Sequence, residues 1–513
     1  MTLSDTTALI QRSALKFFSG TMLSRMTGYL RDVALAYSFG TDPLLASFLV
    51  AFRFAHLARR LFGEGSLQNV FIPHFEELRK KDPAQAQSFF RDTSFSLALF
   101  IALLSLGIAL ALSPFLSNEI VLLTCLMLPS LLFICLFGLN AALLECEKSY
   151  FLPSIAPVAF NLVWIVAALS LGAYPVAEAV KGLSLAVIAA CFFQWAVTVP
   201  SLIKNTSWTF WKQARAFSPD VRTLVKPLLL ANIGVAASQI NNAVDPLFAL
   251  YANSEGPAWL WYAIRLQQLP LALFGVAMTG ALLPPLSRAI KAGLLQQGAE
   301  FFHFALKRLS LLTIPISFLI IPTALNAIAL LFGHGSFQYS SIENSAFCLL
   351  FYGMGIFPMA HILISAPALY AFKDYRSPTL FSILCMGANV LLNALFIFVL
   401  GFGAASVAAA TSIAAFLNAA LLHRLVEQKM GAQPTIRKEI VQMCLASSLG
   451  LVAVFYADYM VWGSVPAWDL LLGNKPWIPE DTINQMGALL RETGIFAGVT
   501  GGILAWQGFL KKT

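Results

Sequence analysis

Long apolar stretches recur along almost the whole chain, separated by short polar connections, and this pattern constrains the fold more than any other feature. A helix that crosses the hydrocarbon core of a bilayer needs about 20 apolar residues. Of the 513 residues, 58% are hydrophobic and 11% are charged, a balance that the surface of a soluble protein could not carry. We therefore predict an all-α polytopic membrane protein of about fourteen transmembrane helices. The predicted helices are 14–37, 44–66, 90–112, 120–144, 154–173, 178–202, 222–251, 257–286, 304–332, 345–371, 378–400, 404–425, 438–462 and 487–509.

The charge of the connections alternates along the chain. The connections rich in Lys and Arg all fall on one face of the predicted bundle: 59–91, 148, 204–226, 288–308, 373–376, 424–438 and 511–512. The positive-inside rule makes that face cytoplasmic and places both termini there, as expected of a protein of an inner, cytoplasmic membrane. Topology thus accounts for most of the net charge of +8, and no nucleic-acid partner is predicted. Segment 463–486, which carries Lys475 and two tryptophans, is predicted to lie on the membrane surface.

One pattern recurs at a constant offset. Arg53 is followed nine residues later by Phe62-Gly63, and Arg265 is followed nine residues later by Phe274-Gly275, an offset of 212. An even number of helices per copy predicts two parallel, pseudo-symmetric six-helix lobes followed by two C-terminal helices. The predicted lobes are 1–203 and 204–430, and the C-terminal pair is 431–513. Chance similarity between two Phe- and Leu-rich helices is the alternative.

Five arginines inside predicted helices are candidates for the transport path, because a charge at the bilayer centre costs at least about 2.5 kcal/mol and so normally faces a bundle interior or a wet cavity. They are Arg25, Arg31, Arg53, Arg59 and Arg265. The nearby acids Asp32 and Glu64 leave a positive excess, and Asp32 shares a helix face with Arg25. Guanidinium groups with such an excess suit a phosphate or pyrophosphate. Salt bridges between helices, or snorkelling of Arg59, are the alternative.

A second polar group falls in the predicted helices of the second lobe. It comprises Asp245, Asn389, Asn393 and Thr411, with Val407 one turn before the threonine. One carboxylate with amide, hydroxyl and backbone oxygens could hold a sodium ion, and hydrogen bonding that merely packs the helices is an equal alternative. No other cofactor is predicted.

The remaining chemistry-bearing residues give no constellation. The histidines 74, 303, 334, 361 and 423 are scattered without ligand spacing, which is typical of packing or interfacial residues. No nucleophile-base set or phosphate-binding loop is found, and the connections are too short for a catalytic domain. A transporter is predicted rather than an enzyme.

Six short segments of the sequence resemble the MurJ/MviN family. They are LSRMTGYLRD (23–32), VAFR (50–53), RRLFGEG (59–65) and FIP (71–73) in the first lobe, and WYAIRL (261–266) and LFGHGSF (331–337) in the second. The resemblance implies the MOP-superfamily fold, with C-terminal helices that form a groove for lipid. The family's pyrophosphate arginines match Arg25, Arg31, Arg59 and Arg265, and its sodium pattern resembles Asp245, Asn389, Asn393, Val407 and Thr411. Asn393 stands where the family can have a carboxylate.

The activity that this resemblance implies is the flipping of lipid II, the undecaprenyl-pyrophosphate-linked peptidoglycan precursor, from the cytoplasmic to the periplasmic leaflet. Alternating access of the two lobes would move the head group through an arginine-lined cavity. The expected partners are lipid II, membrane lipids and enzymes of cell-wall synthesis. A cation-coupled exporter, or a flippase of another polyprenyl-linked glycan, is the alternative in the same superfamily, and a non-transporting scaffold is the alternative from another class.

Overall fold

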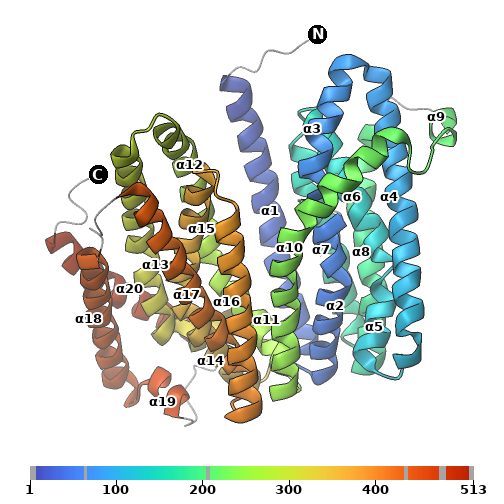
Figure 1. Cartoon of the computed structure of the whole chain (residues 1–513). Helices are drawn as coiled ribbons and strands as arrows, with labels where there is room; N and C mark the ends of the chain where they lie inside the picture. The colour runs from blue at the N-terminus through green and yellow to red at the C-terminus, as the bar shows by residue number, and fades with distance from the viewer. Residues whose placement is uncertain (1–6, 63–65, 204–207, 432–436, 473–480, 508–513) are drawn as a thin grey trace. The chain divides into compact units, whose positions relative to one another are not determined.

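The computed structural model describes residues 7–62, 66–203, 208–431, 437–472 and 481–507, and every regular element within these ranges is helical (Figure 1). Turns of 3-10 or π geometry lie at Ser113–Phe115, Leu271–Gly275 and Leu395–Val399. The α-helices are α1 (Thr7–Phe39), α2 (Pro43–Phe62), α3 (Ser66–Lys81), α4 (Pro83–Leu112), α5 (Glu119–Met127), α6 (Ser130–Cys146), α7 (Phe151–Leu171), α8 (Val176–Ile203), α9 (Trp208–Lys212), α10 (Pro219–Ala252), α11 (Gly256–Pro270), α12 (Val276–Lys291), α13 (Leu295–Phe332), α14 (Tyr339–Met354), α15 (Ile356–Ala371), α16 (Arg376–Ala394), α17 (Ala405–Met430), α18 (Arg437–Trp462), α19 (Pro466–Leu472) and α20 (Thr482–Trp506).

Each predicted membrane crossing coincides with a helix or a pair of helices. Within the described residues, nine helices are long and apolar enough to cross a membrane, and the number is eleven if each of two bent pairs forms one span. α1, α2 and α10 overlap the other three predicted ranges but do not meet this measure in the part of the chain described. The protein is therefore a multi-pass membrane protein, and the count of fourteen stays a prediction.

The helix order of the first half recurs in the second half. α1 ends at Phe39 and α10 at Ala252, 213 residues apart, and α4 begins at Pro83 and α13 at Leu295, 212 residues apart. This is the offset that relates Arg53 to Arg265 in the sequence. In the first half α2 is followed by α3, and in the second half α11 is followed by a π-helical turn and α12. A parallel duplication explains the coincidence.

The packing inside each half follows the same scheme. α2 packs against α5, α3 against α4 and α6, and α8 against α5, α6 and α7. In the second half α11 packs against α14, α12 against α13 and α15, and α17 against α14, α15 and α16. The two copies therefore share their internal neighbours as well as their helix order.

Bent spans occupy equivalent places in the two copies. α5 and α6 meet at an angle of 43°, and α14 and α15 meet at 41°. The first bend falls at Leu128-Pro129, where proline removes a backbone donor, and the second falls at Gly355. A side chain at Gly355 would meet Ser412 of α17 at 2.6 Å, so the bend also allows close helix packing.

The chain forms two compact units, Met1–Ala243 and Val244–Thr513, whose boundary lies inside α10. The start of α10 is held on the first unit because the preceding loop is bound to α4. Asp92, itself paired with Arg91 at 2.9 Å, accepts the backbone N–H of Arg215, and Ser96 accepts that of Phe217. The predicted divisions at 203/204 and 430/431 stay predictions.

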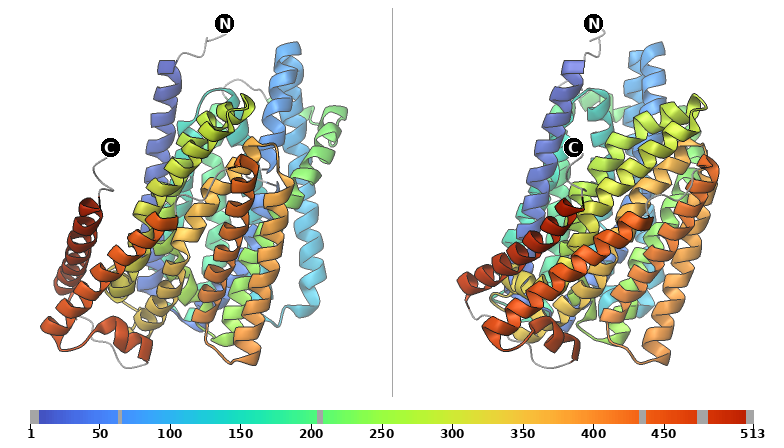
Figure 2. Two further views of the ribbon diagram at one scale, coloured as in Figure 1. Left: turned by 60° about the vertical axis from the view of Figure 1, so that its left-hand side comes forward. Right: turned by 90° about the vertical axis from the view of Figure 1, so that its left-hand side faces the viewer.

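The C-terminal helices α18 and α20 lie side by side in the second unit (Figure 2). Met443 and Ala446 of α18 and Leu504 of α20 pack with Ile314 of α13 in one buried apolar cluster. α19 is a short helix inside the segment 463–486, for which a position on the membrane surface stays a prediction. Residues 473–480, which include Lys475, lie outside the described part of the chain.

Candidate functional site

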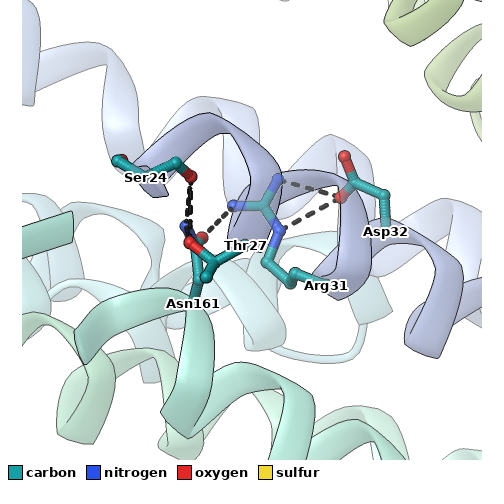
Figure 3. Close-up of polar contacts among 5 residues, drawn as sticks. All are labelled: Ser24, Thr27, Arg31, Asp32 and Asn161. Atoms are coloured by element: carbon teal, nitrogen blue, oxygen red, sulfur yellow. Dashed lines mark hydrogen bonds and ion pairs between the residues drawn. The ribbon is translucent and has the colours of Figure 1, made fainter. Parts of the chain in front are cut away.

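Arg31 is the centre of a polar contact between α1 and α7 (Figure 3). Its Nε and Nη2 donate to Oδ1 of Asp32 at 3.1 and 2.9 Å, and its Nη1 donates to Oδ1 of Asn161 at 3.2 Å. The amide nitrogen of Asn161 donates to the carbonyl of Ser24 at 3.1 Å and to the hydroxyl of Thr27 at 3.0 Å. Two turns of α1 are thus tied to one amide of α7, which fixes the direction of the guanidinium.

Aromatic side chains of α2 and α7 complete this contact. The guanidinium carbon of Arg31 lies 5.1 Å from the ring centre of Trp164, which is buried against Phe48 and Phe52 of α2. A cation over an indole face is stabilised by the ring quadrupole, and more strongly where water is excluded. The structure therefore holds Arg31 by charge, hydrogen bonds and stacking together.

The structure pairs Asp32 with its neighbour Arg31, although helix geometry predicted that Asp32 shares a face with Arg25. The guanidinium of Arg31 bends back toward the adjacent carboxylate, which is only 2% exposed. Arg25 is exposed. Arg31 is thus neutralised by its neighbour in α1, whereas the side chain of Arg25 is exposed.

The other arginines of the prediction lie on α2 and α11. Arg53 and Arg59 are half-buried on α2, and each takes part in further contacts. Glu64 lies outside the described residues. Arg265 belongs to the second unit, where its guanidinium carbon lies 4.2 Å from the ring centre of the buried Trp261. Nothing in the structure assigns a role to these residues, and their part in substrate binding stays a prediction.

The second predicted group does come together within the second unit. Asn389 and Asn393 of α16 donate to Oδ1 of Asp245 at 2.8 and 3.0 Å, and the hydroxyl of Thr411 lies 3.1 Å from Oδ2. The same hydroxyl lies 2.9 Å from the carbonyl of Val407. Asp245, Asn389 and Asn393 are all buried, so α10, α16 and α17 meet around one carboxylate.

This donor set fits a hard monovalent cation in its chemistry. The carboxylate, two amides, a hydroxyl and a backbone carbonyl are all oxygen donors, and the buried Oδ1 of Asn393 has no hydrogen-bond partner among the described residues. The amide nitrogens face Asp245, so turning each amide about its Cβ–Cγ bond would present two oxygens instead. No cluster of three or more His, Cys, Asp or Glu side chains suited to a metal occurs in the described ranges.

Sequence reasoning missed Asn161 and Trp164. Both lie in an apolar stretch, 154–173, which reads as an ordinary membrane helix. A polar amide among apolar residues was the available signal, but its partner on α1 is 130 residues away in the chain. Only the packing of α1 against α7 reveals the contact.

The fold defined by these helices is that of the MOP-superfamily membrane transporters. A structure described as "Lipid II flippase MurJ, inward closed conformation" superposes with a TM-score of 0.75 at 21% identity, covering 94% of this chain and 98% of that chain. An inward-facing multidrug resistance MATE transporter of the MOP superfamily gives a TM-score of 0.65 at 15% identity, covering 82% of this chain and 98% of that chain.

The sequence narrows that class to one family. The family described as "Lipid II flippase MurJ" matches residues 35–471. The "Probable lipid II flippase MurJ" of Chlamydia trachomatis serovar D is 30% identical, over 97% of this chain and 94% of the relative. The "Lipid II flippase MurJ" of Burkholderia cenocepacia is 30% identical, over 83% of this chain and 85% of that protein. The chain belongs to the lipid II flippase MurJ family.

Proposed function

We propose that this protein flips lipid II from the cytoplasmic to the periplasmic leaflet of the bacterial inner membrane. The observation that carries the proposal is family membership over residues 35–471 together with a relative named as a lipid II flippase that matches nearly the full length. A transporter needs no bond-making residues, and we assign the chain no catalytic activity. Its termini are proposed to be cytoplasmic, on the side of the Lys- and Arg-rich connections.

The arginines supply the chemistry for the pyrophosphate head. Arg31 is fixed by Asp32 and Asn161, so it contributes a directed positive potential with little freedom to move. Arg25, six residues earlier on the same helix, is exposed and can offer its planar fork to two phosphate oxygens at once. Arg53, Arg59 and Arg265 are proposed to extend this positive lining, with Glu64 and Asp32 limiting its net charge.

The duplicated architecture supplies the two halves that alternating access requires. Each half contains one bent span, α5–α6 or α14–α15, at which a bundle can change curvature without losing its other helix contacts. The polyprenyl tail is proposed to stay in lipid while the head group passes between the leaflets. Membrane lipids and enzymes of cell-wall synthesis are the further proposed partners.

A sodium ion is proposed to bind at Asp245, Asn389, Asn393, Thr411 and the carbonyl of Val407. The buried carboxylate and the unpartnered amide oxygen of Asn393 support this assignment. A bound ion would supply positive charge to a carboxylate that already accepts neutral donors from α16 and α17.

Depletion of the protein in cells tests the proposed substrate. Lipid II should then remain in the inner leaflet, so its head group should lose accessibility to a membrane-impermeant reagent added outside. Re-expression of the wild-type protein should restore the accessibility. Unchanged accessibility after depletion would exclude lipid II as the substrate.

Reconstituted vesicles test the arginine lining separately. Arg53→Ala and Arg265→Ala should each lower lipid II flipping by at least about tenfold, because each removes a charge-assisted contact worth about 1.5–3 kcal/mol. Arg308→Ala is the matched control, since Arg308 stacks on Phe304 of its own helix and lies outside the predicted set. Wild-type rates in both test variants would refute the arginine-lined cavity. Faster movement of a different polyprenyl-pyrophosphate glycan would favour the alternative flippase.

A further inference from the structure

Three side chains of the second unit form a continuous hydrogen-bonded chain that the transport proposal does not use. Nε2 of His361 on α15 lies 3.2 Å from Nδ1 of His423 on α17. Nε2 of His423 lies 3.1 Å from Oε1 of Glu427, one turn further along the same helix. The sequence pattern favoured scattered packing roles for the histidines, and the fold instead joins two of them that are 62 residues apart.

The hydrogens of this chain can be assigned from its chemistry. An ionised carboxylate only accepts, so Nε2 of a neutral His423 carries its hydrogen and donates to Glu427. Nδ1 of His423 is then an acceptor, and Nε2 of His361 must donate to it. Both bonds point in one direction, from the buried His361, which is 6% exposed, to Glu427 in the last turn of α17.

Other titratable side chains lie near these three residues. His303 of α13 interacts with His423, Glu427 and Glu439, and Lys307 of α13 is paired with Glu439 of α18 at 3.4 Å. α12 contributes Leu282 and Leu286 to the core beside α15, and Phe302 of α13 stacks on His423. With neutral histidines, the ammonium of Lys307 is paired with Glu439, and a proton bound to the histidines would add positive charge beside the carboxylate of Glu427.

The equivalent interface of the first unit shows that the fold does not need histidines here. α6 and α8 pack as α15 and α17 do, and the polar contact between them joins the side chains of Asn140 and Thr198 at 3.0 Å. Neither of these groups titrates in the physiological range. The second unit therefore has titratable side chains at an interface where the contact between Asn140 and Thr198 in the first unit is neutral.

We propose that His361, His423 and Glu427 form a proton-binding site of the second unit, with Glu427 as its entrance. A proton bound at Nδ1 of His361 leaves both hydrogen bonds in place. It can then pass outward by two linked transfers: Nε2–H of His361 moves to Nδ1 of His423, and Nε2–H of His423 moves to Glu427. Both histidines end neutral and Glu427 ends as the acid, so the step balances. The reverse order admits a proton from the entrance.

The site can couple proton binding to the shape of the unit. His361 lies six residues beyond Gly355, at the bend between α14 and α15, and His423 belongs to α17, which packs against both helices of the bent pair. Charging the buried pair changes the preferred distance between α15 and α17. The proposed proton site therefore lies near the bend of the second unit.

Nitrogen-15 NMR of histidine-labelled protein in lipid nanodiscs tests the site without any transport assay. At high pH, His423 should show the Nε2–H tautomer and a coupling through the hydrogen bond to His361, and both signals should change together as the pH falls. His361→Gln should remove this shared transition, and the double variant His361→Asn/His423→Thr, which copies the first unit, should remove it in a folded protein. Independent titration of the two histidines would overturn the proposal in favour of a packing pair.

A second experiment measures transport, and it rests on the proposed function. In proteoliposomes that flip lipid II, the wild-type rate should change by about tenfold per pH unit on the limiting side of a one-proton titration, and both variants should flatten this dependence. His334→Gln is the matched control, because Nε2 of His334 lies 3.2 Å from the Leu330 carbonyl of the same helix end. Absence of flipping in the wild type would refute the proposed function and leave the NMR result standing. An unflattened pH profile in both variants would overturn the coupling.

Discussion

Asp32 in α1 and Asp245 in α10 occupy nearly the same place in the duplicated fold but have opposite surroundings. The two residues are 213 positions apart, and so are the ends of their helices, Phe39 and Ala252. Both carboxylates are buried, at 2% and 7% exposure. Asp32 is preceded by Arg31, which neutralises it, whereas Asp245 is preceded by Val244 and meets two amides and a hydroxyl.

The residue before each acid differs, and so do the contacts of the carboxylate. In the first unit Arg31 pairs with the carboxylate, and the arginines of α1 and α2 are proposed to bind an anion. In the second unit two amides and a hydroxyl surround the carboxylate, and a mobile cation is its proposed ligand. The duplication kept the buried acid and changed its partner.

The largest effect is expected from Arg31→Ala, which leaves Asp32 buried without its charge partner. Breaking a buried pair by removing one member costs about 3–5 kcal/mol, and the apparent Tm in detergent should fall by roughly 5–10 °C. The double variant Arg31→Ala/Asp32→Ala should recover most of the loss, because no unpaired charge remains. A Tm of Arg31→Ala equal to that of the wild type would show that the pair contributes nothing to stability.

A smaller effect is expected at Asp245, and it should depend on the salt. Sodium at about 100 times its Kd should stabilise the wild type by about 2.7 kcal/mol relative to choline at equal ionic strength. Asp245→Asn should abolish this difference, because the amide carries no charge. Asp32→Asn is the matched variant and should keep the sodium response. Equal responses of the two variants would remove the distinction between the two acids.

Arg25→Ala should separate transport from stability on a single helix. The side chain is exposed, so the Tm should stay within about 1–2 °C of the wild type. The rate of lipid II flipping should fall by about tenfold, equivalent to about 1.4 kcal/mol, if the guanidinium binds the head group. A normal flipping rate with an unchanged Tm would assign Arg25 to the lipid head groups of the membrane instead.

The fold could be predicted from sequence because membrane helices must satisfy their backbone hydrogen bonds internally and therefore appear as long apolar runs. The duplication could be predicted because the pattern of Arg53 and Phe62-Gly63 recurs at Arg265 and Phe274-Gly275 with one offset. The short amphipathic helix α3 and the division of the predicted spans at Pro129 and Gly355 could not be, since hydropathy averaged over a crossing does not register a local break.

The contacts of the candidate sites were harder to predict than their residues. Spacing identified Arg31, Asp32 and the Asp245 group and placed Asp32 on the face of Arg25, but it did not reveal the pair of Asp32 with Arg31, which forms because a flexible side chain can reach around a helix. Asn161, the partner of Arg31, and His361, the partner of His423, lie on other helices, and no short sequence pattern marks either contact. Contacts between distant helices are fixed by packing, which a single sequence does not encode in any short pattern.

The smallest effect is expected from an ion pair outside the membrane-spanning segments, which sets the scale for the buried ones. Asp374, between α15 and α16, accepts from Lys429 at 2.8 Å and from the backbone and hydroxyl of Ser377. The hydrogen bond from Lys429, followed by that from the Ser377 backbone, lowers the pKa of Asp374 to about 2 from its ordinary value of 3.8. A lowered pKa in the folded state means that the stabilisation is complete above pH 3.8 and is lost as the pH falls toward 2.

Asp374→Asn should therefore lower stability by less than about 1 kcal/mol at pH 7, because water screens the pair. The difference in Tm from the wild type should be the same at pH 7 and pH 5 and should shrink below about pH 4. Thermal scans at these pH values, beside Arg31→Ala, give the comparison directly. A loss as large as that of Arg31→Ala would mean that burial between α1 and α7 adds nothing to the strength of the Arg31–Asp32 pair.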